Sequence, residues 1–332
     1  MDKSQISDSP VLLPETKLCI HFGHPTYRFS ETALSRNVDY EYFQTWNIKD
    51  TLARVEKADV LVISGFWEDG LLKSGHKLKY IQSISAGYEQ FPVDKLRRRG
   101  IYLCTASGVN ADAVSHHAMS LVLSFVRQLH IARDNQTSQY WRPWISDRNR
   151  REQDLCKKTM LIIGLGEIGS RLSRIAKAFG MRVIGVKNDI TEHNGIVDEL
   201  YPAPKLKYLL NKADFVVLSC PLTPDTRNLI DKAAFAEMQT SSYLINVARG
   251  GCVEEKALLE ALENGQIAGA AIDHFIDEPL PASSPFWNIK NLIITPHTGG
   301  ETAKYEDNLI DILLENIQRL SNKDTTLINR VV

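Results

Sequence analysis

Residues 159–169, Thr-Met-Leu-Ile-Ile-Gly-Leu-Gly-Glu-Ile-Gly, place an uninterrupted apolar run directly before a glycine-rich turn. The run predicts a buried parallel strand, and residues 170–179 have the pattern of a helix that follows it. Gly164 suits a tight turn, Gly166 allows close approach of the backbone to a pyrophosphate, and Gly169 lets the helix pack closely on the strand. The start of such a helix offers unpaired N–H groups and the positive end of its dipole to phosphates. The order of strand, glycine turn and helix therefore predicts a dinucleotide-binding domain.

The same alternation of strand-like runs and helical patterns extends along the chain and predicts an α/β fold with parallel sheets. Upstream, a small α/β unit is expected from four strands, at residues 17–22, 58–64, 80–85 and 101–105. Downstream, the first strand of the second sheet is joined by runs at residues 181–186, 214–219, 242–247, 268–273 and 292–295. Apolar positions three and four apart predict a connecting helix over residues 111–129.

Residues 134–154 are polar and have no regular pattern, yet they contain Tyr140, Trp141 and Trp144. A long irregular segment in a compact domain is usually a functional loop or a contact between subunits. Because two exposed tryptophans would be costly, we expect this segment to contact a partner subunit in a homodimer.

Composition excludes several other kinds of protein. The chain has 332 residues, which is enough for two domains. Its net charge of −1 lacks the positive excess that is typical of a nucleic-acid-binding protein. Its densest basic stretch, residues 95–99, is interpreted as a solvated helix face. No apolar run approaches the roughly 20 residues of a membrane span, and the polar start lacks signal-peptide character, so a cytoplasmic protein is expected.

Neither a disulfide framework nor a metal site is expected. The number of cysteines is odd and no pair has Cys-x-x-Cys spacing; they are Cys19, Cys104, Cys156, Cys220 and Cys252. The adjacent His116 and His117 point about 100° apart on a helix and do not readily share one ion.

The end of the strand at residues 181–186 bears on the choice of cofactor. An acid there would bind the ribose hydroxyls of NAD(H), but the strand runs into Lys187 and Asn188, which favour the 2′-phosphate of NADP(H). Asp189 follows at about the usual distance from the glycine turn, so NAD(H) stays possible.

Three side chains follow strand-like runs of the second sheet: Arg249, Glu278 and His297. Ligands of open α/β sheets bind beyond the carboxyl ends of the strands, so the three should converge beside the cofactor. A planar cation suits a carboxylate, a histidine can move a proton near neutral pH, and an acid can orient that histidine and favour its charged form. Together these are the groups that a reductase needs.

The motifs that carry these residues resemble those of the D-isomer-specific 2-hydroxyacid dehydrogenase family, with glyoxylate/hydroxypyruvate reductases as the nearest type. The match extends from about Leu78 to Gly300 and includes Ser85–Gly87, Gly164–Gly169, Cys220–Thr226, Asn246–Gly251, Asp273–Pro279 and Thr295–Gly300. The resemblance implies two Rossmann-like or flavodoxin-like domains with the active site in the cleft between them. A discontinuous substrate-binding domain would comprise residues 1–112 and 300–332, closed by a returning helix at 301–320. The NAD(P)-binding domain would comprise residues 113–299.

The resemblance also implies roles for individual residues. Ser85 begins a loop whose Ala86 and Gly87 N–H groups would hold the substrate carboxylate, together with Arg249 and His297. The backbone around Glu167 and Ile168 would bind the pyrophosphate, and Asp273 the nicotinamide carboxamide. The rest of the cofactor groove would be lined by Cys220, Pro221, Thr226, Val247, Ala248, Arg249, His297 and Gly299.

The implied reaction is hydride transfer between nicotinamide C4 and a small 2-oxoacid, with His297 as acid/base. Bulky residues at Ser64–Trp67 and at Trp141 and Trp144 favour a small substrate such as glyoxylate or hydroxypyruvate. The alternative is a nicotinamide-sensing, corepressor-like binding protein in which catalysis is incidental. His274 stands where an apolar residue is common and is interpreted as a loop histidine with satisfied hydrogen bonds.

Overall fold

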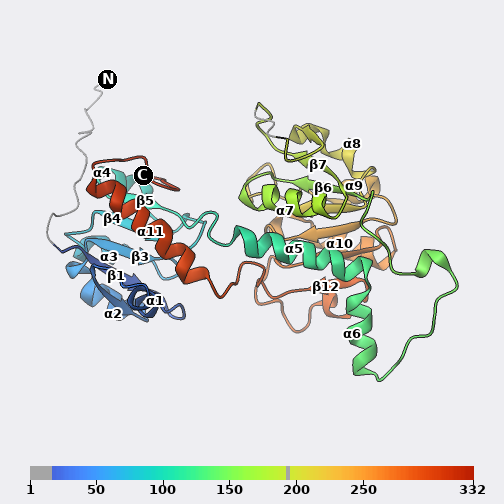
Figure 1. The fold of residues 1–332 in the computed structure, drawn as a ribbon, viewed down its shortest axis with the longest axis horizontal. Helices are drawn as coiled ribbons and strands as arrows, with labels where there is room; N and C mark the ends of the chain where they lie inside the picture. The colour runs from blue at the N-terminus through green and yellow to red at the C-terminus, as the bar shows by residue number, and fades with distance from the viewer. Residues whose placement is uncertain (1–16, 192–194) are drawn as a thin grey trace. The chain divides into compact units, whose positions relative to one another are not determined.

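The computed structural model describes residues 17–191 and 195–332. The chain forms two compact units, one of residues up to Asn110 together with Thr302–Val332, the other of Ala111–Glu301 (Figure 1). Each unit is a parallel sheet with helices, as the α/β pattern predicts. Within the described residues, no helix combines the length and apolarity needed to cross a membrane.

The first unit contains a five-stranded parallel sheet of order β2-β1-β3-β4-β5. Its strands are β1 Cys19–Gly23, β2 Glu41–Thr45, β3 Val60–Ile63, β4 Tyr80–Ser83 and β5 Tyr102–Cys104. The prediction of four strands was wrong, because β2 was taken for part of a polar connection. This strand lies at the sheet edge and is only partly buried, so its sequence, Glu-Tyr-Phe-Gln-Thr, lacks the apolar run of the central strands.

Helices of the first unit include one from the far end of the chain. They are α1 Phe29–Ser35, α2 Ile48–Arg54, η1 Val55–Lys57, α3 Gly70–Ser74, α4 Val93–Arg98 and α11 Tyr305–Ser321. Buried Leu309, Leu313 and Ile317 of α11 pack in the same core as strands β1, β3 and β4. The Tyr305 hydroxyl donates a hydrogen bond to the Ile84 carbonyl at 2.5 Å. The final helix is therefore an integral part of the first unit.

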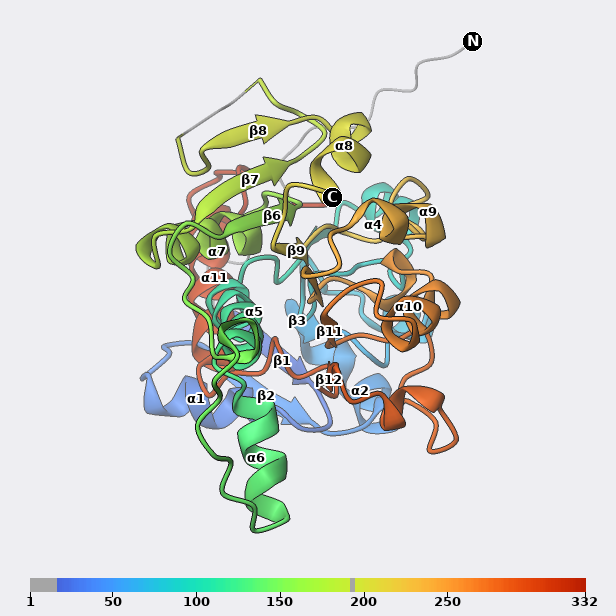
Figure 2. The same cartoon turned by 90° about the vertical axis from the view of Figure 1, so that its right-hand side faces the viewer.

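The second unit contains a seven-stranded parallel sheet of order β12-β11-β10-β9-β6-β7-β8 (Figure 2). Its strands are β6 Thr159–Ile163, β7 Arg182–Val186, β8 Glu199–Tyr201, β9 Phe215–Leu218, β10 Tyr243–Asn246, β11 Gly269–Ile272 and β12 Leu292–Ile294. The short, half-exposed edge strand β8 was not predicted. Its helices are α5 Ala111–Val126, α6 Leu129–Thr137, η2 Arg148–Arg150, α7 Glu167–Ala178, η3 Ala203–Lys205, α8 Leu206–Leu210, α9 Lys232–Glu237, η4 Gly250–Cys252, α10 Glu255–Glu263 and η5 Pro285–Asn288.

Strand β6 explains why this stretch of sequence is uninterruptedly apolar. Leu161 and Ile163 belong to one core cluster, whereas Met160 and Ile162 belong to another. Successive side chains of a strand point to opposite faces, so both faces of β6 are covered. The chain order reverses at this strand, which lies between β7 and β9, and such a switch point is where open α/β sheets bind ligands.

The connecting helix ends earlier than predicted. Helix α5 ends at Val126, because Gln128 adopts a left-handed backbone (φ 52°). A second helix, α6, begins at Leu129 and extends into the first residues of the predicted irregular segment 134–154. No residue of α6 is buried, and α6 stands away from the sheet of its unit (Figure 2). Trp141 and Trp144 in the following segment are 95% and 101% exposed.

Candidate active site

The glycine turn has the geometry of a dinucleotide cradle. Gly164 has a φ of 97°, and a Cβ atom there would lie 2.7 Å from the backbone of Cys220. A Cβ on Gly169 would lie 2.0 Å from the Gly164 carbonyl oxygen, so α7 packs directly on the turn. Gly166 faces open space, and no side chain caps the start of α7. The first N–H groups of this helix are therefore left for a ligand, which fits a bound pyrophosphate.

Glu167 adds an acid at the first position of α7, close to where phosphates would bind. Its carboxylate pairs with Arg171 one turn later, and the Arg171 guanidinium also lies 2.5 Å from Asp112. Arg171 is thus shared by two carboxylates, one on α7 and one on α5, and it draws the Glu167 side chain along the helix toward the second turn.

Loops after β9 and β10 form the adjoining part of the proposed groove. Thr226 closes the 220–226 loop, because its hydroxyl donates to the Pro221 carbonyl at 2.6 Å and accepts from the Thr223 N–H at 2.7 Å. Val247 and Ala248 are 3% and 4% exposed, and the Ala248 N–H is held by the Asn246 side chain at 3.0 Å. The Val247 N–H also donates to the Leu218 carbonyl at 3.2 Å, so internal hydrogen bonds fix the backbone of both residues beside the proposed groove.

At the end of β7, Lys187 is half-buried and Asn188 is exposed. Asp189, the alternative ribose ligand, accepts hydrogen bonds from the N–H and hydroxyl of Thr191 at 2.9 and 2.6 Å. These bonds hold the pKa of Asp189 below its usual value. Its carboxylate is thus already engaged in a local turn.

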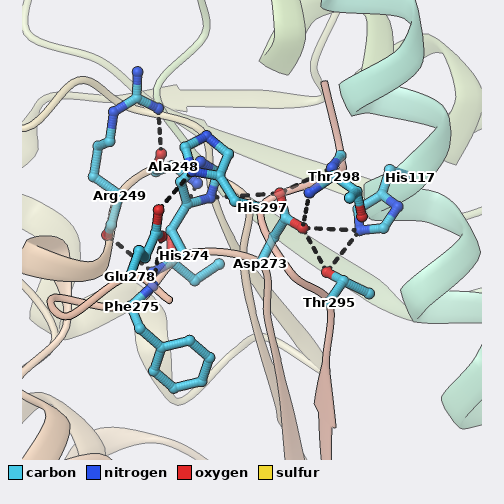
Figure 3. Close-up of polar contacts among 12 residues, drawn as sticks. His117, Ala248, Arg249, Asp273, His274, Phe275, Glu278, Thr295, His297 and Thr298 are labelled. Carbon is cyan, nitrogen blue, oxygen red and sulfur yellow. Dashed lines mark hydrogen bonds and ion pairs between the residues drawn. The ribbon is translucent and has the colours of Figure 1, made fainter. Parts of the chain in front are cut away.

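His297 and Glu278 are brought together as predicted. The His297 Nδ1 atom lies 2.7 Å from Glu278 Oε2, and Glu278 Oε1 accepts the Phe275 N–H at 3.0 Å (Figure 3). The His297 side chain is 52% exposed, so the ring remains accessible beyond its contact with Glu278. His297 also has a φ of 55°, a conformation that costs a non-glycine residue about 1 kcal/mol.

Asp273 holds the backbone that keeps His297 in this conformation. One carboxylate oxygen accepts the Thr295 hydroxyl at 2.6 Å and the Thr298 N–H at 3.0 Å, and the other accepts the Gly299 N–H at 3.0 Å. The Asp273 carbonyl accepts the His297 N–H at 2.9 Å. Asp273 is 1% exposed, and Figure 3 shows these bonds converging on it. A Cβ on Gly299 would lie 2.8 Å from this carboxylate, which explains the glycine there.

Arg249 follows β10 and is exposed. One guanidinium nitrogen donates to the Ala248 carbonyl at 2.7 Å, and within residues 17–191 and 195–332 no carboxylate forms an ion pair with Arg249. An exposed guanidinium without an acidic partner keeps most of its planar fork available for a carboxylate ligand.

Gly250 joins the loops that carry Arg249 and Glu278. A Cβ on Gly250 would lie 2.2 Å from the Phe275 carbonyl carbon and 2.6 Å from the Ile276 nitrogen. Only glycine lets the backbone after β10 approach the backbone after β11 this closely. The spacing between Arg249 and the loop of Glu278 therefore depends on the absence of a side chain at this position.

The predicted carboxylate loop lies at the end of β4 in the first unit. The Ser85 hydroxyl donates to the Gly87 carbonyl at 2.9 Å and lies 2.6 Å from the Ser64 hydroxyl. Among the described residues, no acceptor is found for the Ala86 or Gly87 N–H group. Two neighbouring N–H groups on such a loop can bind an anion. The Glu89 carboxylate lies beside Gly87, 2.8 Å from where a Cβ would stand, and an anionic ligand would have to displace it.

Two residues of the site were missed or misjudged from the sequence. His117 Nε2 lies 3.0 Å from the Thr295 hydroxyl and 3.6 Å from Asp273, because α5 runs beside the loop after β12. His274 was expected to have satisfied hydrogen bonds, but its buried Nδ1 has no hydrogen-bond partner in the part of the chain that the structure describes. In the sequence, only the position of His274 directly after Asp273 indicated that it belongs to the site.

Known proteins were compared with the chain. Residues 119–299 match the family described as D-isomer specific 2-hydroxyacid dehydrogenase, NAD binding domain. A glyoxylate reductase/hydroxypyruvate reductase of Mus musculus is 32% identical, over 86% of this chain and 89% of the relative. A D-3-phosphoglycerate dehydrogenase of Methanocaldococcus jannaschii is 33% identical over 82% of this chain, which spans only about half (51%) of that relative. A family protein of Aeromonas salmonicida superposes with a TM-score of 0.82 at 29% identity, covering 95% of this chain and 99% of the other.

The chain belongs to the D-isomer specific 2-hydroxyacid dehydrogenase family. It is an oxidoreductase that acts on CH–OH groups with a nicotinamide cofactor. The alternative of a corepressor-like nicotinamide sensor is not supported by these relatives.

Gly250→Ala tests the close approach of the two loops. The new Cβ meets backbone, so overpacking should cost about 1–3 kcal/mol and lower the melting temperature by several degrees. Turnover should fall as well, since the Glu278 loop must move. Gly251→Ala is the matched control, because a Cβ there lies 3.1 Å from the flexible Leu222 side chain. Equal effects of the two changes, measured by calorimetry and initial rates, would contradict this interpretation.

Proposed function

We propose that the protein is an NADP(H)-preferring reductase of a small 2-oxoacid, of the glyoxylate or hydroxypyruvate type, with His297 as the proton donor. The observation that carries the proposal is the 2.7 Å contact between His297 Nδ1 and Glu278, with the exposed Arg249 on the neighbouring strand end. Bound nicotinamide supplies the hydride that reduces the carbonyl carbon.

His297 provides the proton that the carbonyl oxygen needs as it gains negative charge. Because Glu278 occupies Nδ1, the other ring nitrogen is the one that can face the substrate. The carboxylate fixes the orientation of the ring through this contact. In the reverse direction, the same nitrogen accepts the proton of the hydroxyl group.

Arg249 is proposed to bind the substrate carboxylate and polarise the carbonyl, together with the N–H groups of Ala86 and Gly87. Among residues 17–191 and 195–332, the Arg249 guanidinium has no acidic partner and the Ala86 and Gly87 N–H groups have no acceptor, which supports these roles. Asp273 has a buried carboxylate that already holds the His297 loop; its contact with the nicotinamide carboxamide remains a proposal from the family resemblance.

A small substrate is supported by two observations. The mouse relative is named a glyoxylate reductase/hydroxypyruvate reductase and matches most of both chains. Trp67, in the loop after β3, packs on Phe91 with ring centroids 4.9 Å apart, which places aromatic bulk in the same unit as Ala86 and Gly87. The phosphoglycerate dehydrogenase relative makes 3-phosphohydroxypyruvate the competing substrate to assay.

Replacing the proton donor or the carboxylate ligand should abolish most turnover without abolishing cofactor binding. His297→Gln and Arg249→Ala should each lower kcat with glyoxylate or hydroxypyruvate about 100-fold to 10,000-fold. The exposed His76→Gln is the control and should keep normal rates. Steady-state kinetics and NADPH fluorescence titration separate the two properties. Near-normal kcat in His297→Gln would show that another group donates the proton.

Cofactor preference is proposed to depend on Lys187 and Asn188. The Asp189 carboxylate is bonded to Thr191 and is therefore not poised for the ribose hydroxyls, whereas Lys187 stands at the strand end. Lys187→Asp should therefore lower kcat/KM for NADPH relative to NADH about tenfold or more, since like charge would meet the 2′-phosphate. Lys256→Asp on α10 is the control for the same change in net charge. An unchanged NADPH-to-NADH ratio in Lys187→Asp would refute this assignment.

The segment after α6 is proposed to join two copies of the chain in a homodimer. One surface hollow, with a volume of about 890 Å³, is lined by the exposed side chains of Ile131, Tyr140, Trp141 and Trp144. Such an apolar surface is typical of a subunit contact.

Sedimentation of a Trp141→Ser, Trp144→Ser double variant tests the dimer. The variant should shift from dimer to monomer at micromolar concentration, because the aromatic area that the contact buries is lost. The Trp46→Ser variant, which changes an exposed tryptophan of the first unit, is the control. A wild-type chain that sediments as a monomer would exclude the proposed homodimer.

A further inference from the structure

We infer that His274 is a positioning residue for the reaction: its neutral ring supports one face of the His297 ring and stabilises the imidazolium form of His297. This inference rests on the proposed role of His297 as the proton donor.

The two rings are in direct contact. Their centroids lie 3.9 Å apart and their planes are inclined by 51° (Figure 3). His274 directly follows Asp273 at the end of β11 and is only 6% exposed, whereas His297 is half exposed. The buried His274 ring thereby limits the movement of the His297 ring on one side. Glu278 binds an edge of His297, so the two contacts restrain different motions of the ring.

His274 is placed where it remains uncharged near neutral pH. The pKa of His274 is lowered to about 4, mainly by burial and next by the charge of the neighbouring His297. Asp273 Oδ2, at 3.5 Å from His274 Nδ1, opposes this shift but makes no hydrogen bond to that atom. A neutral π face beside an imidazolium is a favourable contact, whereas a second cation there would be repulsive.

Several charged groups lie near the two rings and must be separated from the effect of His274. Glu278 Oε2 lies 2.7 Å from His297 Nδ1, and the Asp273 carbonyl accepts the His297 N–H. The charges of Asp273, Glu278 and Arg249 also act on His274, and His117 on α5 lies 3.6 Å from Asp273. None of these groups is altered by changing His274 to an uncharged residue. The contribution of the His274 ring can therefore be measured alone.

Two substitutions distinguish the ring from mere volume. His274→Val has an apolar side chain without a ring, and His274→Phe keeps a neutral ring without the nitrogens. If the ring face matters, the valine variant should lose support for His297, and the phenylalanine variant should restore it. If His274 only fills space, the effects of the two variants should follow their changes in volume, and phenylalanine should not restore the support.

The first measurement is the NMR titration of His297 in the protein without cofactor, with the exposed His76 as internal reference. In His274→Val the midpoint of the His297 titration should fall by about half a pH unit, because its charged form loses a favourable contact. His274→Phe should titrate within a few tenths of the wild-type protein. An unchanged midpoint in His274→Val, or an equal fall in His274→Phe, would overturn the inference.

The second measurement is the pH profile of 2-oxoacid reduction. In His274→Val, kcat should fall about three- to tenfold, and the limb that reports loss of the catalytic proton should move to lower pH. His274→Phe should recover both properties. The His297→Gln variant tests the proton-donor role separately from the support by His274. If this variant retains turnover, His297 is not the proton donor. The NMR titration of His297 in the His274 variants then still decides whether the two rings interact. Wild-type rates and pH profile in His274→Val would refute the positioning role.

Discussion

The candidate site depends on the carboxylate of Asp273, which is buried and bonded to the backbone that follows β12. The carboxylate accepts three hydrogen bonds, from the Thr295 hydroxyl and from the N–H groups of Thr298 and Gly299, and these fix the loop around it. His297 lies within this loop and has a left-handed backbone conformation that an unfolded chain would seldom adopt. A buried carboxylate would be costly without these donors, so the acid and the loop stabilise each other.

The other groups of the site are positioned relative to this loop by neighbouring strand ends. Glu278 reaches His297 from the loop after β11, and Arg249 stands after β10, the next strand of the sheet. Gly250 brings these two loops within backbone contact. The parallel sheet brings the three residues to the same edge, and the absence of a Cβ at Gly250 lets the loops after β10 and β11 approach each other closely.

His274 shows how one position can carry a constraint that residue type does not reveal. As a loop histidine it would be solvated and unremarkable, but β11 buries it against the ring of His297. Burial removes its charge near neutral pH and leaves an aromatic surface. The Asp273–His274 dipeptide therefore contacts His297 through both the backbone carbonyl and the adjacent ring.

Much of the fold could be predicted from local pattern. The apolar run of β6 and the glycines after it identify a dinucleotide-binding unit, because each glycine meets a steric demand that is local to the turn. Edge strands β2 and β8 could not be found in this way, since strands that are exposed on one side lack the apolar run. The early end of α5 was also hidden, because Gln128 adopts its left-handed conformation without being a glycine.

The residue types of Arg249, Glu278 and His297 and their places after strands were evident from the sequence by itself, because strand ends in a parallel sheet meet at one edge. Contacts between segments far apart in the chain required the folded molecule. His117 and Thr295 are 178 residues apart in the sequence, yet their side chains are in contact. The backbones at Gly250 and Phe275 approach so closely that a side chain on residue 250 would not fit. Such contacts depend on packing in three dimensions, which no local spacing in the chain encodes.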